Sequence, residues 1–217
     1  STAQVNLNHK FNDNWKLNAI VSMQSYNRNY FSTERPAADA QGIWNRALTR
    51  SKTREFSYNE QINLSGKFKT VGFAHTLLVG ADADQSSIET GAYTNPNNLV
   101  SGTTRYYDQV SLLDFNTFNK PTNFNMPETS LLTNTNAPVF RMGGFAQDLI
   151  ELTKQFKVLA GVRWTFQKTP TTTINTLATG AETKGTVVDK IDKAFSPKVG
   201  LIYQPVVSTS IYASYSN

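Results

Sequence analysis

Cysteine is absent from the 217 residues, and histidine occurs only twice, as His9 and His75. The first absence excludes disulfides, thiolate metal sites and cysteine nucleophiles, and the second excludes a site built from several histidine ligands. The sequence also lacks G-x-S-x-G, H-E-x-x-H, phosphate-loop and G-x-G-x-x-G motifs. We therefore expect a protein that is not an enzyme, with no catalytic residue, no metal site and no cofactor.

Long apolar runs are missing as well. A membrane-spanning helix needs roughly 18 apolar residues, and the most apolar stretches, 76–83 and 157–162, are interrupted or ended by Gly, Asp or Arg. Charged residues make up only 17% of the chain, below the roughly 25% of an ordinary soluble domain. The net charge of +5 comes from dispersed basic residues, so we expect no nucleic-acid partner.

What the sequence does have is alternation with a period of two. Its clearest case is 156–167, where one face carries Phe156, Val158, Ala160, Val162, Trp164 and Phe166, and the other is largely polar. Similar alternation covers 15–24 and 56–68. These patterns last roughly 10 residues, longer than the 5–6 of a typical soluble strand and long enough for a tilted strand to cross a bilayer.

The predicted connections are of two kinds that alternate along the chain. Tight turns rich in Asn, Asp, Gly, Pro or Lys are expected near 11–15, 68–73, 151–156 and 203–209. Long polar loops are expected at about 31–51, 86–137 and 168–193. A structureless loop of some fifty residues is unusual in a compact domain, whereas a transmembrane β-barrel has short turns on one side and long loops on the other.

Aromatic residues flank the predicted tight turns: Phe11, Trp15, Phe68, Phe73, Phe156 and Tyr203. This placement is typical of the belt that a membrane barrel puts where lipid meets water, although hairpin ends in a soluble core also accept aromatics. Glu60 fits poorly, because alternation puts it on the apolar face with Tyr58 and Ile62. Either a bulge shifts the register there or the assignment of faces is wrong.

Several hairpins resemble those of TonB-dependent outer-membrane receptors, especially the ferric-siderophore group. The segments that carry the resemblance are 194–205 with 210–216, 144–148 with 156–164, 75–82, and 9–15. They occur in family order and cover nearly the whole chain. The resemblance implies an all-β fold: an antiparallel meander of about eight long strands over 1–217, forming a slice of a barrel of about 22 strands. The family's plug domain, TonB box and terminal aromatic residue are not visible, which favours an internal fragment over a complete small barrel.

For function, the resemblance implies a receptor in the bacterial outer membrane that binds a ferric siderophore and imports it when TonB pulls on the plug. The implied partners are the ferric siderophore, TonB through the plug region, and outer-membrane lipid and lipopolysaccharide. Hydroxamate, catecholate, citrate-type, cobalamin and glycan ligands all stay open. Two other functions also stay open: a soluble all-β glycan-binding or adhesion module, and a passive outer-membrane porin.

Residues that could contact a ligand lie in the long loops and on the polar strand faces. Aromatic side chains in the second loop could stack on a planar chelating group: Tyr93, Tyr106, Tyr107, Phe115, Phe118 and Phe124. Packing of the loop against itself would explain them equally well. Around the first loop a basic excess suits either an anionic ferric complex or lipopolysaccharide phosphates: Arg28, Arg35, Arg46, Arg50, Lys52 and Arg54.

On the polar strand faces, Arg141 and Arg163 could line the barrel interior. Such arginines usually pair with carboxylates of a neighbouring strand or of the plug. Asp82 and Asp84 share one face at a spacing of two residues, which suits a salt bridge better than a calcium site.

Overall fold

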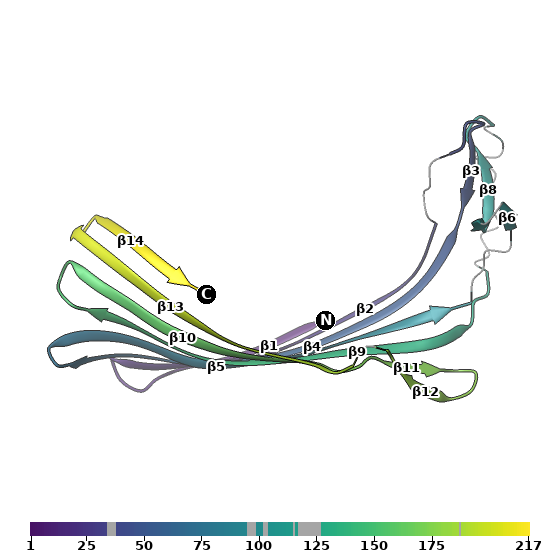
Figure 1. The fold of residues 1–217 in the computed structure, drawn as a ribbon. Helices are drawn as coiled ribbons and strands as arrows, with labels where there is room; N and C mark the ends of the chain where they lie inside the picture. The colour runs from purple at the N-terminus through teal and green to yellow at the C-terminus, as the bar shows by residue number, and fades with distance from the viewer. Residues whose placement is uncertain (34–37, 95–98, 102–103, 115, 117–126, 187) are drawn as a thin grey trace.

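The computed structural model describes the whole chain except residues 34–37, 95–98, 102–103, 115, 117–126 and 187 (Figure 1). Its described elements are strands: β1 (Thr2–Lys10), β2 (Trp15–Thr33), β3 (Ile43–Arg46), β4 (Leu48–Thr70), β5 (Phe73–Tyr93), β6 (Leu99–Ser101), β7 (Thr104–Tyr106), β8 (Asp108–Ser111), β9 (Leu131–Glu151), β10 (Phe156–Thr169), β11 (Thr173–Thr176), β12 (Ala181–Lys184), β13 (Lys190–Val206) and β14 (Thr209–Ser216). Among the described residues, no helix has the length and hydropathy needed to span a membrane.

Eight strands form one antiparallel meander in the order β1-β2-β4-β5-β9-β10-β13-β14. The hairpin β11–β12 joins this sheet beside β9, while β3 pairs with β8 and β6 with β7 in two small sheets. Figure 1 shows a sheet bent into an open trough, with β1 and β14 as its two edges. The expected all-β antiparallel meander of about eight strands is confirmed.

The tight turns gather at one end of the trough, and the long loops leave from the other (Figure 1). Local chemistry fixes each turn. Between β1 and β2, the Asn12 carboxamide oxygen accepts hydrogen bonds from the backbone N–H groups of Asn14 and Trp15, both at 2.9 Å. Between β4 and β5, Val71 and Gly72 both have positive φ, 49° and 86°, which matches the right-handed twist of a two-residue hairpin.

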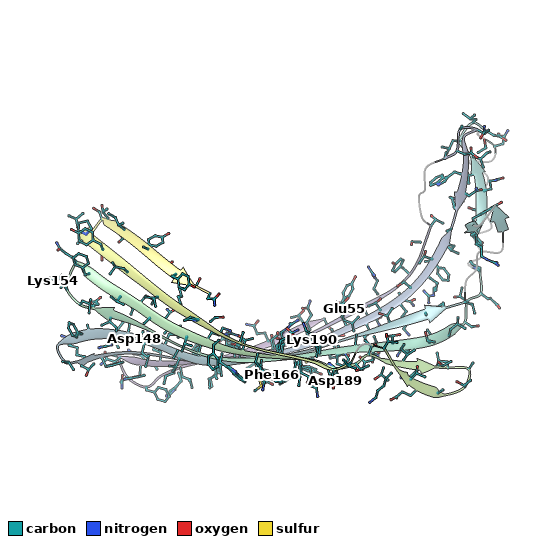
Figure 2. All side chains as sticks on the ribbon, in the orientation of Figure 1. Glu55, Asp148, Lys154, Phe166, Asp189 and Lys190 are labelled. Carbon is teal, nitrogen blue, oxygen red and sulfur yellow. The ribbon has the colours of Figure 1, made fainter. Side chains whose placement is uncertain are left out.

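The two faces of the sheet differ in chemistry as the alternation predicts. Figure 2 shows Glu55 on the concave side and Phe166 on the convex side. The apolar set of β10 faces outward with Phe166, and it is not covered by a second layer: Val162 is 46% exposed, and Phe195 and Val199 of β13 are 70% and 54% exposed. Only Leu48 and Val110 are buried hydrophobic residues in the described part of the chain. The stabilising environment of the convex face must therefore come from outside the chain, as it does for a barrel in lipid.

Aromatic side chains on the convex face stack close to the tight turns. The rings of Trp15 and Phe68 lie 6.3 Å apart and parallel, and Phe68 stacks on His75 at 4.8 Å. Farther around the sheet, Phe156 stacks on Tyr203 at 4.6 Å. The predicted aromatic belt is thus a set of cross-strand contacts that tie adjacent hairpins together.

Glu60 lies on the apolar face of β4, where the alternation places it. Strand β4 pairs with β2 and with β5 without a register shift around Glu60, which lies opposite Val21 and Ala83. No bulge turns the residue inward, so Glu60 lies on the convex face with Tyr58 and Ile62.

The strands continue farther toward the loops than the alternation indicated. Pairing between β2 and β4 extends to Thr33 and Leu48, inside the loop expected at 31–51. In the same way β5 and β9 run to Tyr93 and from Leu131, inside 86–137, and β10 and β13 run to Thr169 and from Lys190, inside 168–193. Backbone pairing needs no apolar face, so a ladder can extend into water after the hydrophobic alternation has stopped.

Candidate functional site

The concave face carries an ion pair that crosses three strands. Arg163 of β10 donates from both terminal nitrogens to the two carboxylate oxygens of Asp82 on β5, each at 2.8 Å. Strand β9 lies between them, and Gly143 occupies its crossing point: a Cβ built there would lie 2.5 Å from a guanidinium nitrogen of Arg163. The missing side chain leaves the space in which the guanidinium reaches Asp82.

A second bridge lies one step nearer the loops. Arg141 of β9 donates to Asp84 of β5 at 3.1 Å and to the side-chain oxygen of Gln167 on β10 at 3.1 Å. The registers place Asp84, Arg141 and Gln167 directly opposite one another on three adjacent strands. The expectation that Arg141 and Arg163 lie on the polar face and pair with neighbouring-strand carboxylates agrees with this geometry.

These bridges border a polar hollow of about 390 Å³ on the concave side. Its lining includes Asn59, Gln61, Asp82, Asp84, Phe145 and Arg163. The Phe145 ring lies 5.9 Å from the Arg163 guanidinium carbon. Asp82 and Asp84 pair with Arg163 and Arg141, and the carboxamides of Asn59 and Gln61 add uncharged hydrogen-bonding groups to the lining.

Above the trough, the small sheet of β3 and β8 is held by a second bidentate pair. Arg46 donates through Nε to Asp108 Oδ1 at 2.7 Å and through a terminal nitrogen to Oδ2. These hydrogen bonds raise the pKa of the Arg46 guanidinium, with burial opposing them. Tyr107 donates its backbone N–H to the Arg46 carbonyl at 2.8 Å. Trp44, next to this pair, has a buried indole nitrogen with no acceptor among the described residues.

Three of the aromatic residues predicted to contact a ligand, Tyr93, Tyr106 and Tyr107, lie in the described part of the chain, each with a different neighbour. Tyr106 lies in β7, opposite Leu99, and Tyr107 lies beside Arg46. The Tyr93 ring lies 4.9 Å from the Arg50 guanidinium, so one of its faces is already occupied. Phe115, Phe118 and Phe124 lie outside the described residues.

Basic residues of the first loop region are divided between three environments. Arg28 lies on the concave face, with its guanidinium 4.9 Å from the Tyr30 ring. Arg46 is tied to Asp108. Arg50, Lys52 and Arg54 alternate along β4 in step with Phe56 and Tyr58, and therefore lie on the convex face. Arg35 lies outside the described residues.

Sequence reasoning missed the partner of Arg46 and the role of Gly143 beside Arg163. Asp108 is 62 residues from Arg46, and no local pattern connects them. Gly143 gave no signal either, because its importance depends on a side chain from the next strand. The outward direction of Arg50, Lys52 and Arg54 did have a signal, since they continue the even-numbered positions of Phe56 and Tyr58.

In the described part of the chain, no group of three or more His, Cys, Asp or Glu residues is placed to hold a metal ion. Asp82 and Asp84 are instead engaged by Arg163 and Arg141.

Comparison with known proteins adds independent information. The family described as "TonB dependent receptor-like, beta-barrel" matches residues 1–217. A probable TonB-dependent siderophore receptor PiuA of Acinetobacter baumannii is 27% identical over 98% of this chain. The chain spans only 29% of the length of that relative.

Among solved structures, the siderophore receptor PiuA from Acinetobacter baumannii superposes with a TM-score of 0.72 at 21% identity, covering 99% of this chain and 31% of that one. The closed form of the ferric-catecholate import receptor Fiu from E. coli gives 0.72 at 17% identity, covering 99% and 32%. The ferripyoverdine receptor of Pseudomonas aeruginosa gives 0.66 at 17%, covering 99% and 26%. At these identities the superpositions establish the shared fold.

Proposed function

The chain belongs to the TonB dependent receptor-like β-barrel family, and from this premise we propose that it forms part of the wall of a receptor that imports ferric siderophores by TonB-coupled active transport. Receptors of this family are β-barrels of the bacterial outer membrane, and the exposed apolar convex face suits that location. The free edges of β1 and β14 would pair with further strands of the whole protein, because an unpaired edge in lipid leaves backbone groups without partners.

The observation that carries the proposal is the match of the family over all 217 residues. It is supported by the concave face, where Asp82 pairs with Arg163 and Asp84 pairs with Arg141 within the wall. The bridge Asp82–Arg163 connects β5 to β10 and the bridge Asp84–Arg141 connects β5 to β9, in addition to the backbone pairing of these strands. We propose that they keep the wall rigid while other parts of the protein move. Specificity for the ligand would come from aromatic side chains of the long second loop, namely Tyr106, Tyr107, Phe115, Phe118 and Phe124.

For the remaining predicted ligand residues, the proposed roles differ. Arg141 and Arg163 would donate to a passing ligand only with the N–H groups that their carboxylate partners leave free. Arg46 would hold the β3–β8 sheet in place, so that the residues of this sheet can contact the ligand. TonB would act through the plug region of the whole protein. Lipid and lipopolysaccharide would contact the convex face.

Iron-limited growth of a strain deleted for the full-length gene tests the proposal. We expect the deletion strain to lose uptake of one radiolabelled ferric siderophore. Returning the gene should restore this uptake, and removing TonB should abolish it again. Hydroxamate, catecholate and citrate-type complexes are supplied separately to identify the class. Unchanged uptake of every ferric complex would reject the assignment, and uptake that is independent of TonB would favour a passive porin.

The soluble glycan-binding alternative requires its apolar faces to be buried against a second sheet. In the described part of the chain they are exposed instead. A full-length protein that stayed soluble without detergent would contradict the membrane receptor and revive that alternative.

A further inference from the structure

The concave face of the wall holds another hollow next to the polar hollow. It has a volume of about 380 Å³, and its lining includes Phe145, Gln147, Gly161, Arg163, Ser196 and Lys198. We propose that this Gly161 hollow is a transit subsite, in which an aromatic ring of an anionic ferric chelate stacks on Phe145 while Lys198 faces its negative charge. The inference rests on the proposed function for one point, namely that the cargo is a ferric siderophore.

The registers place the Gly161 hollow over three adjacent strands. Gly161 of β10 lies opposite Gln147 of β9 and opposite Lys198 of β13. Two residues along β10, Arg163 lies opposite Phe145. Residues directly opposite one another in adjacent strands point to the same side of a sheet, so these residues share the concave face with Arg163. Gly161 leaves the floor of the hollow open, because a Cβ at this position would lie only 3.4 Å from the Gln147 Cβ.

Phe145 separates the Gly161 hollow from the polar hollow. Its side chain lines both of them, so a cargo can reach the ring from either side. The ring lies over Gly80 of β5, where a Cβ would be 2.6 Å from a ring carbon. Among the described residues of β4, β9 and β10, Phe145 is the one aromatic side chain on the concave face. The aromatic belt of the convex face therefore does not account for it.

The charge of the Gly161 hollow is positive. Arg163 and Lys198 line it, and no Asp or Glu is found among its described lining residues. Arg163 is paired with Asp82, whereas Lys198 takes part in none of the ion pairs of the described residues. The polar hollow differs, because Asp82 and Asp84 line it. An anionic cargo is therefore attracted to the Gly161 hollow more than to the polar hollow.

An aromatic ring beside an ammonium group suits one class of chelate. Catecholate groups contain an aromatic ring, which stacks on phenylalanine with the ring centres about 4.5–7 Å apart. A ferric tris-catecholate also has a negative net charge, and its oxygens accept charge-assisted hydrogen bonds from an ammonium group. A ferric tris-hydroxamate is neutral, and its chelating groups contain no aromatic ring. The side chains of the Gly161 hollow thus favour the catecholate class.

The Gly161 hollow is far from the loops that would bind the cargo first. Strand β9 begins at the loop end with Leu131, and Phe145 lies 14 positions farther along it. At about 3.4 Å per residue, this is roughly 45 Å along the strand. A chelate held by the loops does not contact Phe145, so a change in the hollow should slow import without weakening the first binding step.

Uptake and equilibrium binding of a radiolabelled ferric tris-catecholate, in cells that carry the full-length receptor, test the proposal. We expect Phe145→Leu to lower the maximal uptake rate about fivefold, because leucine keeps an apolar side chain but has no ring to stack. The dissociation constant for the same complex should stay unchanged. Phe145→Tyr, which keeps the ring, should import like the unmodified receptor. Lys198→Gln should also lower the maximal rate, by about threefold, with binding unchanged.

The matched controls lie on the convex face of the same two strands. Phe140→Leu changes β9, and Lys193→Gln changes β13. Both should import the complex like the unmodified receptor. The amount of each variant in the outer membrane, measured by immunoblot, normalises the rates. If Phe145→Leu does not reach the membrane, Lys198→Gln and its control decide the matter in the same way.

Three results would overturn the inference. A Phe145→Leu receptor that imports at the unmodified rate would show that the ring only fills space. Weaker equilibrium binding by this variant would place Phe145 in the first binding site. An unmodified receptor that imports a ferric tris-hydroxamate but not the tris-catecholate would contradict the ligand class and leave the proposed function standing. Failure of the proposed function is distinguishable, because the unmodified receptor would then import neither complex, and the inference would fall with it.

Discussion

Arg163 and Asp82 are 81 residues apart in the sequence and two strands apart in the sheet, yet they form a bidentate ion pair. Each terminal guanidinium nitrogen of Arg163 lies 2.8 Å from one carboxylate oxygen of Asp82. The pair spans β9 only because Gly143 has no side chain at the crossing. A carboxylate, a glycine and an arginine on three strands therefore act as one unit, and each of them can be tested separately.

Gly143→Ala should break this unit. The added methyl would lie 2.5 Å from a guanidinium nitrogen of Arg163 and 3.0 Å from the Trp164 carbonyl oxygen, so Arg163 must leave Asp82. We expect a loss of about 1–3 kcal/mol in the free energy of unfolding, measured by urea unfolding of the full-length receptor in detergent. Gly144→Ala is the matched control, because its Cβ would meet nothing closer than 3.8 Å. Equal loss in both variants would contradict the explanation.

A double-mutant cycle on Asp82→Asn and Arg163→Gln should show favourable coupling. The two side chains are 33% and 39% exposed, so solvent screening limits the coupling to about 0.5–1 kcal/mol despite the two-pronged geometry. Unfolding free energies of the unmodified receptor, the two single variants and the double variant give the value. Coupling between Asp82 and Arg141, which belong to different bridges, should be smaller. A cycle with no coupling would mean that the pair does not stabilise the wall.

The pair between His75 and Asp148 on the convex face should behave differently from the concave pairs. Its Nδ1–Oδ2 distance is 2.6 Å, and the second nitrogen of His75 is buried without a partner among the described residues. His75→Phe leaves the Asp148 carboxylate without this hydrogen-bond partner on the convex face, and we expect a loss of about 1–3 kcal/mol in the free energy of unfolding. The double variant His75→Phe/Asp148→Leu should recover most of it, because it removes the unpaired charge as well. Thermal unfolding in detergent measures the stabilities of the unmodified receptor, the single variant and the double variant. The single variant should unfold at the lowest temperature.

Acid should loosen the connection between β10 and β13. The backbone N–H and the hydroxyl of Thr171 both donate to Asp189 and lower the pKa of that carboxyl below its ordinary value of 3.8. A carboxyl whose pKa is lower when folded than when unfolded stabilises the fold above the unfolded pKa. That contribution is lost as pH falls through the folded pKa.

We therefore expect faster hydrogen exchange at the Thr171 amide once the pH is below the folded pKa of Asp189, after correction for intrinsic rates. Asp189→Asn should remove the pH dependence while leaving exchange within β10 unchanged. Protection at Thr171 that was the same for both proteins at every pH would show that the carboxylate does not order this segment.

Local pattern determined the faces and the turns of this protein. In 156–167 the alternation of apolar and polar residues fixes which side chains share a face, because successive side chains of a strand point in opposite directions. The turn at Asn12 likewise follows from a side chain that bonds its own backbone within three residues. These are short-range effects, and they were enough to predict long strands with one apolar face, joined alternately by tight turns and long loops. The meander of about eight strands was implied by the family resemblance.

Tertiary structure alone decided which charges meet and how far the ladders extend. Arg46 and Asp108, 62 residues apart in the sequence, come together because β3 and β8 form a small sheet. Arg163 reaches Asp82 because three registers and one glycine coincide. The sequence contains both partners in each case, but only the paired strands set the distance between them, and the strength of an ion pair or a hydrogen bond depends on that distance.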